Sequence, residues 1–75
     1  MSNLKKISGK ECVKILCNKF NFEVIRQTGS HIILRHNEPP HRRLTVPNHD
    51  EIAKGTLLSI ISQSGASKEE FLKLL

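Results

Sequence analysis

With 75 residues, the chain has room for a single domain, residues 1–75, and little room for a second one. Its composition, 37% hydrophobic and 25% charged, excludes a disordered chain, and no apolar run reaches the about 20 residues that cross a membrane. The net charge of +5 is concentrated before Asp50, where nine Lys and Arg side chains stand against three acidic ones, and this favours a polyanionic partner.

The first predicted element is a helix from Gly9 to Lys19. Ser8 and Glu11 have the spacing of a capping box, in which each side chain binds a free backbone N–H of the first turn. Behind this box, apolar residues recur every three or four positions and form one stripe: Cys12, Val13, Leu16, Cys17 and Phe20. Cysteines five residues apart on such a stripe match neither a redox pair nor half of a zinc site, so we expect reduced, unreactive thiols.

Three strands are predicted next. Residues 22–27 are rich in β-forming residues, and residues 31–36 resume as a second strand. Between them, the turn of residues 28–30 contains a glycine, which accepts a positive φ without strain. A proline-rich loop, which cannot continue a β-ladder, separates this hairpin from a third strand over residues 42–46 that ends at Pro47.

The chain then returns to helices. A loop over residues 48–54 leads into a helix that ends at Gly65. Its apolar residues are Leu57, Leu58, Ile60 and Ile61. Ser67 and Glu70 repeat the capping-box spacing and begin a short last helix.

The order of these elements predicts an α+β fold. Three antiparallel strands have one face to cover, and the two main helices carry the apolar stripes that cover it. This α-β-β-β-α layout, with a short additional C-terminal helix, is the arrangement of the double-stranded-RNA-binding fold. A fold does not establish a function, so the chemistry has to be inferred from particular side chains.

Elimination points to a histidine as the reactive group. The four histidines are separated by five, five and eight residues and have no cysteine pair nearby, which matches no common zinc site. The cysteines belong to the apolar stripe, and the paired carboxylates at residues 50–51 and 69–70 lie in a loop and at a helix start. No phosphate-binding loop or dinucleotide fingerprint is present.

His31 is the preferred histidine, because it follows a Gly-Ser turn at the start of a strand, where a side chain is both exposed and rigidly held. Imidazole, with an ordinary pKa of about 6.5, exchanges a proton near neutrality. Metal-free RNA cleavage needs such a group to remove the proton of the ribose 2′-OH, and it needs cations to offset the charge that grows on the phosphate. On spacing alone, the better interpretation is a structural one, in which His31 hydrogen-bonds to the backbone of its turn.

Arginines accompany His31 on the strands. Strand alternation puts Arg35 on the same face as His31, and Arg26, across the hairpin, is a candidate to join them. Arg42 and Arg43 add one candidate to each face. Alternatively, these arginines form a solvated sheet edge that protects against aggregation.

Three motifs in order resemble the HicA (YcfA-like) toxin family. They are the Gly29-Ser30-His31 turn after an aromatic-led strand with Arg26, the segment Leu44-Thr45-Val46-Pro47-Asn48-His49, and the segment Lys54-Gly55-Thr56-Leu57-Leu58-Ser59-Ile60. The similarity spans about residues 7–72. Asn21 stands where family members usually have glycine, and we expect it to adopt the same left-handed backbone. The loop of residues 37–41 is individual to this chain.

The resemblance implies a double-stranded-RNA-binding-like fold and a metal-independent endoribonuclease, an mRNA interferase that is the toxin of a type II toxin–antitoxin system. It implies His31 as the catalytic residue, no cofactor, and a HicB-like antitoxin, encoded next to the toxin, that covers the active site. We assign His49 a supporting role. The residues expected to bind RNA are Arg26, Gly29, Ser30, Arg35, Arg42 and Arg43.

The cytoplasm is the expected compartment, because Met1–Lys6 leads into no apolar signal segment. Two other functions stay open. One is a non-catalytic module that binds double-stranded RNA, and it predicts salt-sensitive RNA binding without cleavage. The other is a protein-interaction domain whose basic face meets an acidic partner.

Overall fold

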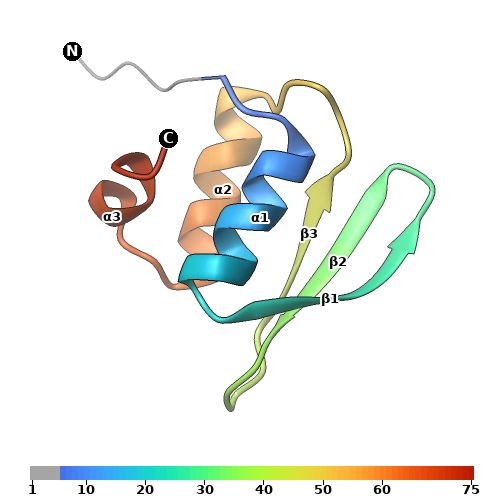
Figure 1. The fold of residues 1–75 in the computed structure, drawn as a ribbon, viewed down its shortest axis with the longest axis vertical. Helices are drawn as coiled ribbons and strands as arrows, with labels where there is room; N and C mark the ends of the chain where they lie inside the picture. The colour runs from blue at the N-terminus through green and yellow to red at the C-terminus, as the bar shows by residue number, and fades with distance from the viewer. Residues whose placement is uncertain (1–5) are drawn as a thin grey trace.

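The computed structural model describes residues 6–75 and contains the elements in the predicted order (Figure 1). They are helix α1 (Gly9–Lys19), strands β1 (Phe22–Thr28), β2 (His31–His36) and β3 (Arg43–Pro47), helix α2 (Lys54–Ser64) and the short helix α3 (Lys68–Leu72). Residues 1–5 of the expected domain, and with them most of the Met1–Lys6 segment, lie outside the described residues. No helix among residues 6–75 is long and apolar enough to span a membrane.

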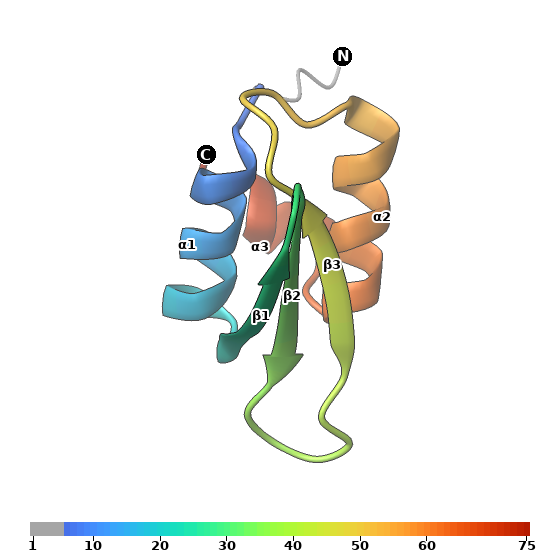
Figure 2. The same ribbon diagram turned by 90° about the vertical axis from the view of Figure 1, so that its right-hand side faces the viewer.

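The strands form one antiparallel sheet in the order β1-β2-β3, and α1 and α2 pack on the same face of it (Figures 1 and 2). Alternation along β2 and β3 explains this arrangement. Ile32, Leu34, Leu44 and Val46 are buried beneath the helices, whereas the residues between them point to the other face. The predicted α+β architecture with both main helices on one face is confirmed.

The start of α1 is fixed by local and long-range contacts. The Ser8 hydroxyl accepts a hydrogen bond from the Glu11 N–H, and the Glu11 carboxylate accepts one from the Ser8 N–H, both at 3.1 Å, so the predicted capping box is present. The Gly9 N–H donates to the His49 carbonyl at 2.8 Å. A Cβ at Gly9 would overlap the carbonyl oxygen of Pro47. Only glycine therefore lets the first turn of α1 lie directly against the end of β3.

The other helices differ from expectation in detail. The helix α2 begins at Lys54 with no side-chain cap and ends, as predicted, at Gly65, whose φ is +81°. At α3, the Ser67 hydroxyl accepts a hydrogen bond from the Glu70 N–H at 3.0 Å but donates its own proton to the Glu70 carboxylate. This carboxylate bonds the serine side chain and not its backbone N–H, so the second predicted capping box forms in one direction only.

The β1–β2 hairpin is closed by two residues, Gly29 and Ser30, between paired Thr28 and His31. Gly29 has a φ of +55°, and Ser30 does not share this left-handed conformation, which is the pattern of a type II′ turn. At the other end of β1, Asn21 has a φ of +62°, as expected for a residue that replaces glycine.

A β-bulge between Val24 and Arg26 interrupts β1. Phe22 and Arg26 are four residues apart, so a regular strand would point both side chains to the same face. Because the bulge shifts the alternation by one residue, Phe22 pairs with His36 and is 2% exposed in the core, whereas Arg26 pairs with Ile33 on the opposite face. The bulge thus lets one short strand supply both a core aromatic and a surface arginine.

The strand β3 runs one residue later than predicted, over Arg43–Pro47, with Pro47 paired to His31. Proline is tolerated there because β3 is an edge strand, where a backbone nitrogen that faces away from the sheet needs no hydrogen-bond partner.

Every element contributes to the core between sheet and helices. Its largest fully buried side chains are Phe71, Leu16, Leu34, Leu57, Val46 and Cys12. Both cysteines are free thiols, as predicted.

Candidate nucleic-acid interface

Figure 2 shows that one face of the sheet is turned away from the helices. The pairing register places three rows of side chains on this face, and each strand contributes one side chain to each row. Cross-strand partners in an antiparallel sheet point to the same side, so the pairing register defines the rows. In the order β1, β2, β3 they are Thr28, His31 and Pro47; Arg26, Ile33 and Thr45; and Glu23, Arg35 and Arg43. We term these nine residues the open face.

His31 lies in the first row, next to the hairpin turn, and its side chain is exposed. Within residues 6–75 its ring makes no hydrogen bond or ion pair, so the structural interpretation, a histidine tied to the backbone of its turn, is wrong. The turn itself is held firmly, because the Ser30 carbonyl accepts a hydrogen bond from the Asn48 N–H at 2.6 Å. His31 is therefore an available imidazole on a fixed backbone.

His49 lies in the segment that follows β3, close to the turn before His31. Its carbonyl accepts the hydrogen bond from Gly9, while its side chain is exposed. Its neighbour Asn48 binds the Ser30 carbonyl. The link between α1, this segment and the hairpin turn thus runs through the backbone, and the predicted supporting role of the His49 ring stays a prediction.

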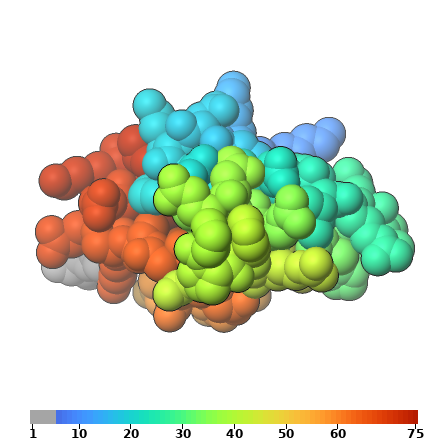
Figure 3. Space-filling view, turned by 90° about the horizontal axis from the view of Figure 1, so that it is seen from below, coloured from blue at the N-terminus to red at the C-terminus, as the bar shows by residue number. Residues whose placement is uncertain are grey.

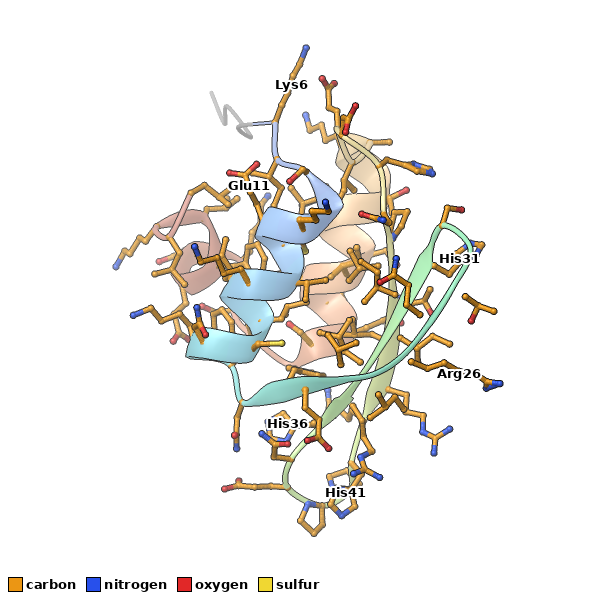
Figure 4. The ribbon with its side chains drawn as sticks, turned by 45° about the vertical axis from the view of Figure 1, so that its right-hand side comes forward. Lys6, Glu11, Arg26, His31, His36 and His41 are labelled. Atoms are coloured by element: carbon orange, nitrogen blue, oxygen red, sulfur yellow. The ribbon has the colours of Figure 1, made fainter. Side chains whose placement is uncertain are left out.

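Three of the four expected arginines belong to the open face. Arg26 occupies the row next to His31, and Arg35 and Arg43 face each other in the third row. Figure 4 shows Arg26 and His31 on the same side of the hairpin, away from the helices. With a rise of about 3.3 Å per residue, successive rows are about 7 Å apart, so the third row lies about 13 Å from His31. Arg26 is the arginine nearest to His31 by this measure.

Arg42 lies on the other side of the sheet, as alternation predicts. Its carbonyl accepts a hydrogen bond from the His36 N–H at 2.7 Å, and its guanidinium lies against Gly65. A cation is favoured at this position because the carboxyl end of α2 carries partial negative charge. Arg42 is thus separated from the other three arginines, and its predicted RNA contact stays a prediction.

His36 and His41 lie at the opposite end of the sheet from His31 (Figure 4). Seen from below, the β2–β3 loop faces the viewer at the centre of the molecule (Figure 3). The Nδ1 atom of His36 accepts a hydrogen bond from the Glu38 N–H, and the Nδ1–H of His41 donates to the His36 carbonyl, both at 3.1 Å. The edge of the His36 ring also packs against Phe22, with ring centres 5.0 Å apart. These histidines stabilise the β2–β3 loop. Among the described residues, no three His, Cys, Asp or Glu side chains are grouped to hold a metal ion.

The thiols are poor nucleophiles in this fold. Burial raises the pKa of Cys12 to about 12. Burial also raises the pKa of Cys17, an effect that the nearby Val24 backbone opposes and the charge of Glu23 reinforces. Since the thiolate is the reactive form of cysteine, neither residue is suited to nucleophilic catalysis.

Sequence reasoning missed Glu23, the acidic member of the open face. Arg35 donates a hydrogen bond from Nη2 to the Glu23 carboxylate at 2.9 Å. The pair forms because the bulge places Glu23 directly opposite Arg35. A regular strand, counted from the hairpin turn, would have put Val24 there, so no local signal identifies this contact.

Comparison with known proteins shows the family of this chain. The family model described as HicA toxin of bacterial toxin-antitoxin matches residues 9–66, a span that includes the hairpin turn, the segment after β3 and the start of α2. No curated protein and no solved structure matches the chain.

Proposed function

Because the chain belongs to the HicA toxin family of bacterial toxin–antitoxin systems, we propose that it is an endoribonuclease that cleaves mRNA with His31 as its general acid/base. The observation that carries the proposal is the unpartnered imidazole of His31 on the open face, one row from Arg26. An exposed ring on a fixed turn is able to approach a ribose without first giving up a hydrogen bond within the protein.

The chemistry follows from these groups. His31 removes the proton of the ribose 2′-OH, and the oxygen attacks the adjacent phosphorus while the bond to the 5′-oxygen breaks. A proton delivered to that leaving oxygen completes the step, which yields a 2′,3′-cyclic phosphate and a 5′-hydroxyl. Arg26 offsets the charge that grows on the phosphate. Arg35 and Arg43 lie farther along the strands and bind neighbouring phosphates, and the backbone at Gly29 and Ser30 borders the bound ribose.

Regulation by an antitoxin is part of the same proposal. A toxin of this family has an antitoxin as its partner. We expect a HicB-like protein, encoded beside this gene, that covers the open face and thereby blocks access of RNA to His31.

The test compares two histidine variants. We expect His31→Ala to lower the rate of RNA cleavage by about 10²–10⁴-fold, the usual contribution of a general acid/base, while the fold is retained. His41→Ala is the matched control, because its exposed ring lies in the β2–β3 loop and outside the open face. Cleavage of a single-stranded RNA is followed on gels in the presence of a metal chelator, and circular dichroism verifies folding.

Other results would point elsewhere. Cleavage by folded His31→Ala at the wild-type rate would exclude His31 as the catalytic residue. Salt-sensitive RNA binding by the wild-type protein without cleavage products would favour a non-catalytic RNA-binding module. A module that binds double-stranded RNA typically has a cluster of basic residues at the start of its last main helix. The first turn of α2 has Lys54 as its single cation, so this turn offers little support for such a module.

A further inference from the structure

The third row of the open face combines charges of both signs. Glu23, Arg35 and Arg43 stand side by side across the three strands. Glu23 and Arg35 form an ion pair at 2.9 Å, with side chains that are 46% and 40% exposed. Among residues 6–75, Arg43 has no ion-pair partner. The row therefore has a net charge of one positive unit, although it contains two arginines.

The guanidinium of Arg35 is only partly satisfied by this pair. One nitrogen, Nη2, donates to Glu23, while the Nε–H is shielded from solvent and has no hydrogen-bond partner. On its other side Arg35 faces Arg43, and like charges directly opposite each other on a sheet are unfavourable. A phosphate group between the two arginines would relieve that repulsion and supply acceptors for the Nη N–H groups that Glu23 leaves unused.

The position of the third row determines whether this phosphate is the one at the cleaved bond or a neighbouring one. His31 and Arg35 are four residues apart on β2, which corresponds to about 13 Å. Arg35 is also held within its own row, where it bonds Glu23 and faces Arg43, so its guanidinium is not directed toward His31. A phosphate held by Arg35 and Arg43 is therefore a neighbour of the cleaved one, and its binding affects the affinity for RNA and not the chemical step.

We propose that Glu23 is an internal competitor for RNA phosphate. It occupies Arg35 in the free protein and weakens RNA binding at the third row, because the phosphate must displace it and then remain beside its negative charge. This inference rests on the proposed function, in which the open face binds RNA. Glu23 is in this sense a specificity-determining residue, since it limits attraction between the basic face and nucleic acid in general.

The test replaces the carboxylate by an amide of the same shape. Glu23→Gln keeps an oxygen that accepts a hydrogen bond from Arg35 but removes the charge. Glu51→Gln is the matched control, because it removes the same charge at a different place. The ion pair of Glu51 with Lys6, at 3.7 Å, lies outside the open face. Binding to a 2′-O-methyl oligoribonucleotide, which lacks the reactive 2′-OH, is measured by fluorescence anisotropy over a series of salt concentrations.

We expect Glu23→Gln to bind this oligonucleotide about fivefold more tightly than Glu51→Gln does at low salt, because it removes one nearby like charge. The slope of the logarithm of the binding constant against the logarithm of the salt concentration becomes steeper by about 0.7. This is the value for one additional phosphate contact on a single strand. With cleavable RNA, KM falls by a similar factor while kcat stays within about twofold of the wild-type value.

Two outcomes would overturn the proposal. If the wild-type protein cleaves RNA but Glu23→Gln binds it no more tightly than Glu51→Gln, Glu23 does not compete with phosphate, and the proposed nuclease function is unaffected. If the wild-type protein neither binds nor cleaves RNA, both proposals fail together.

Discussion

Substitution of Gly9 by alanine tests the close approach of α1 to β3. The new Cβ would overlap the carbonyl oxygen of Pro47 and come within 3.0 Å of the Asn48 Cα. Both neighbours are backbone atoms, so neither moves aside as a flexible side chain would. The helix has to shift away, and the hydrogen bond from the Gly9 N–H to the His49 carbonyl, 2.8 Å long, is strained or lost.

The magnitude follows from these contacts. Overpacking of this kind costs about 1–3 kcal/mol, and loss of one backbone hydrogen bond adds about 1 kcal/mol. The better helix propensity of alanine offsets about 0.5–1 kcal/mol. We therefore expect Gly9→Ala to lower the free energy of unfolding by about 1–3.5 kcal/mol. The total free energy of unfolding of a domain of this size is about 4–11 kcal/mol. The corresponding fall in Tm is about 4–28 °C.

Gly55→Ala is the matched control, because it makes the same chemical change in the first turn of α2. No heavy atom lies within 4 Å of a Cβ at Gly55. This variant should gain about 0.5–1 kcal/mol from the reduced entropy of the unfolded chain. Urea denaturation followed by far-UV circular dichroism measures both variants. If Gly9→Ala were as stable as Gly55→Ala, the inferred contact between α1 and β3 would be refuted.

Two further predictions concern the core. Leu34→Ala, which truncates a fully buried side chain of the central strand, should lower the free energy of unfolding by about 2–5 kcal/mol, and a loss below 1 kcal/mol in urea denaturation would contradict its place in the core. For Cys12, burial raises the pKa from 9.0 to about 12, so between these values the unfolded chain loses a proton that the folded chain keeps. Stability should therefore fall by up to about 1.4 kcal/mol per pH unit above pH 9, and Cys12→Ala should remove this part of the slope in urea titrations at pH 9–10.5; an equal slope in both proteins would refute it.

Much of the fold could be predicted because its signals are local. The capping box of Ser8 and Glu11 acts within four residues, and Gly29 closes its turn through its own backbone freedom. Alternation along β2 separated the buried Ile32 and Leu34 from His31 and Arg35, which correctly placed these two on one face. Helix starts, tight turns and two-residue periodicity depend on neighbours in the chain, so the sequence by itself determined the order of elements and the face on which His31 stands.

What only the tertiary structure decided involves residues far apart in the chain. The bulge in β1 reconciles the burial of Phe22 with the outward position of Arg26, and it brings Glu23 opposite Arg35. The requirement for glycine at Gly9 comes from the end of β3, almost forty residues later. Each of these features depends on how the sheet and helices meet in space. Neither periodicity nor residue type reports such contacts, because the packing of the whole domain selects them.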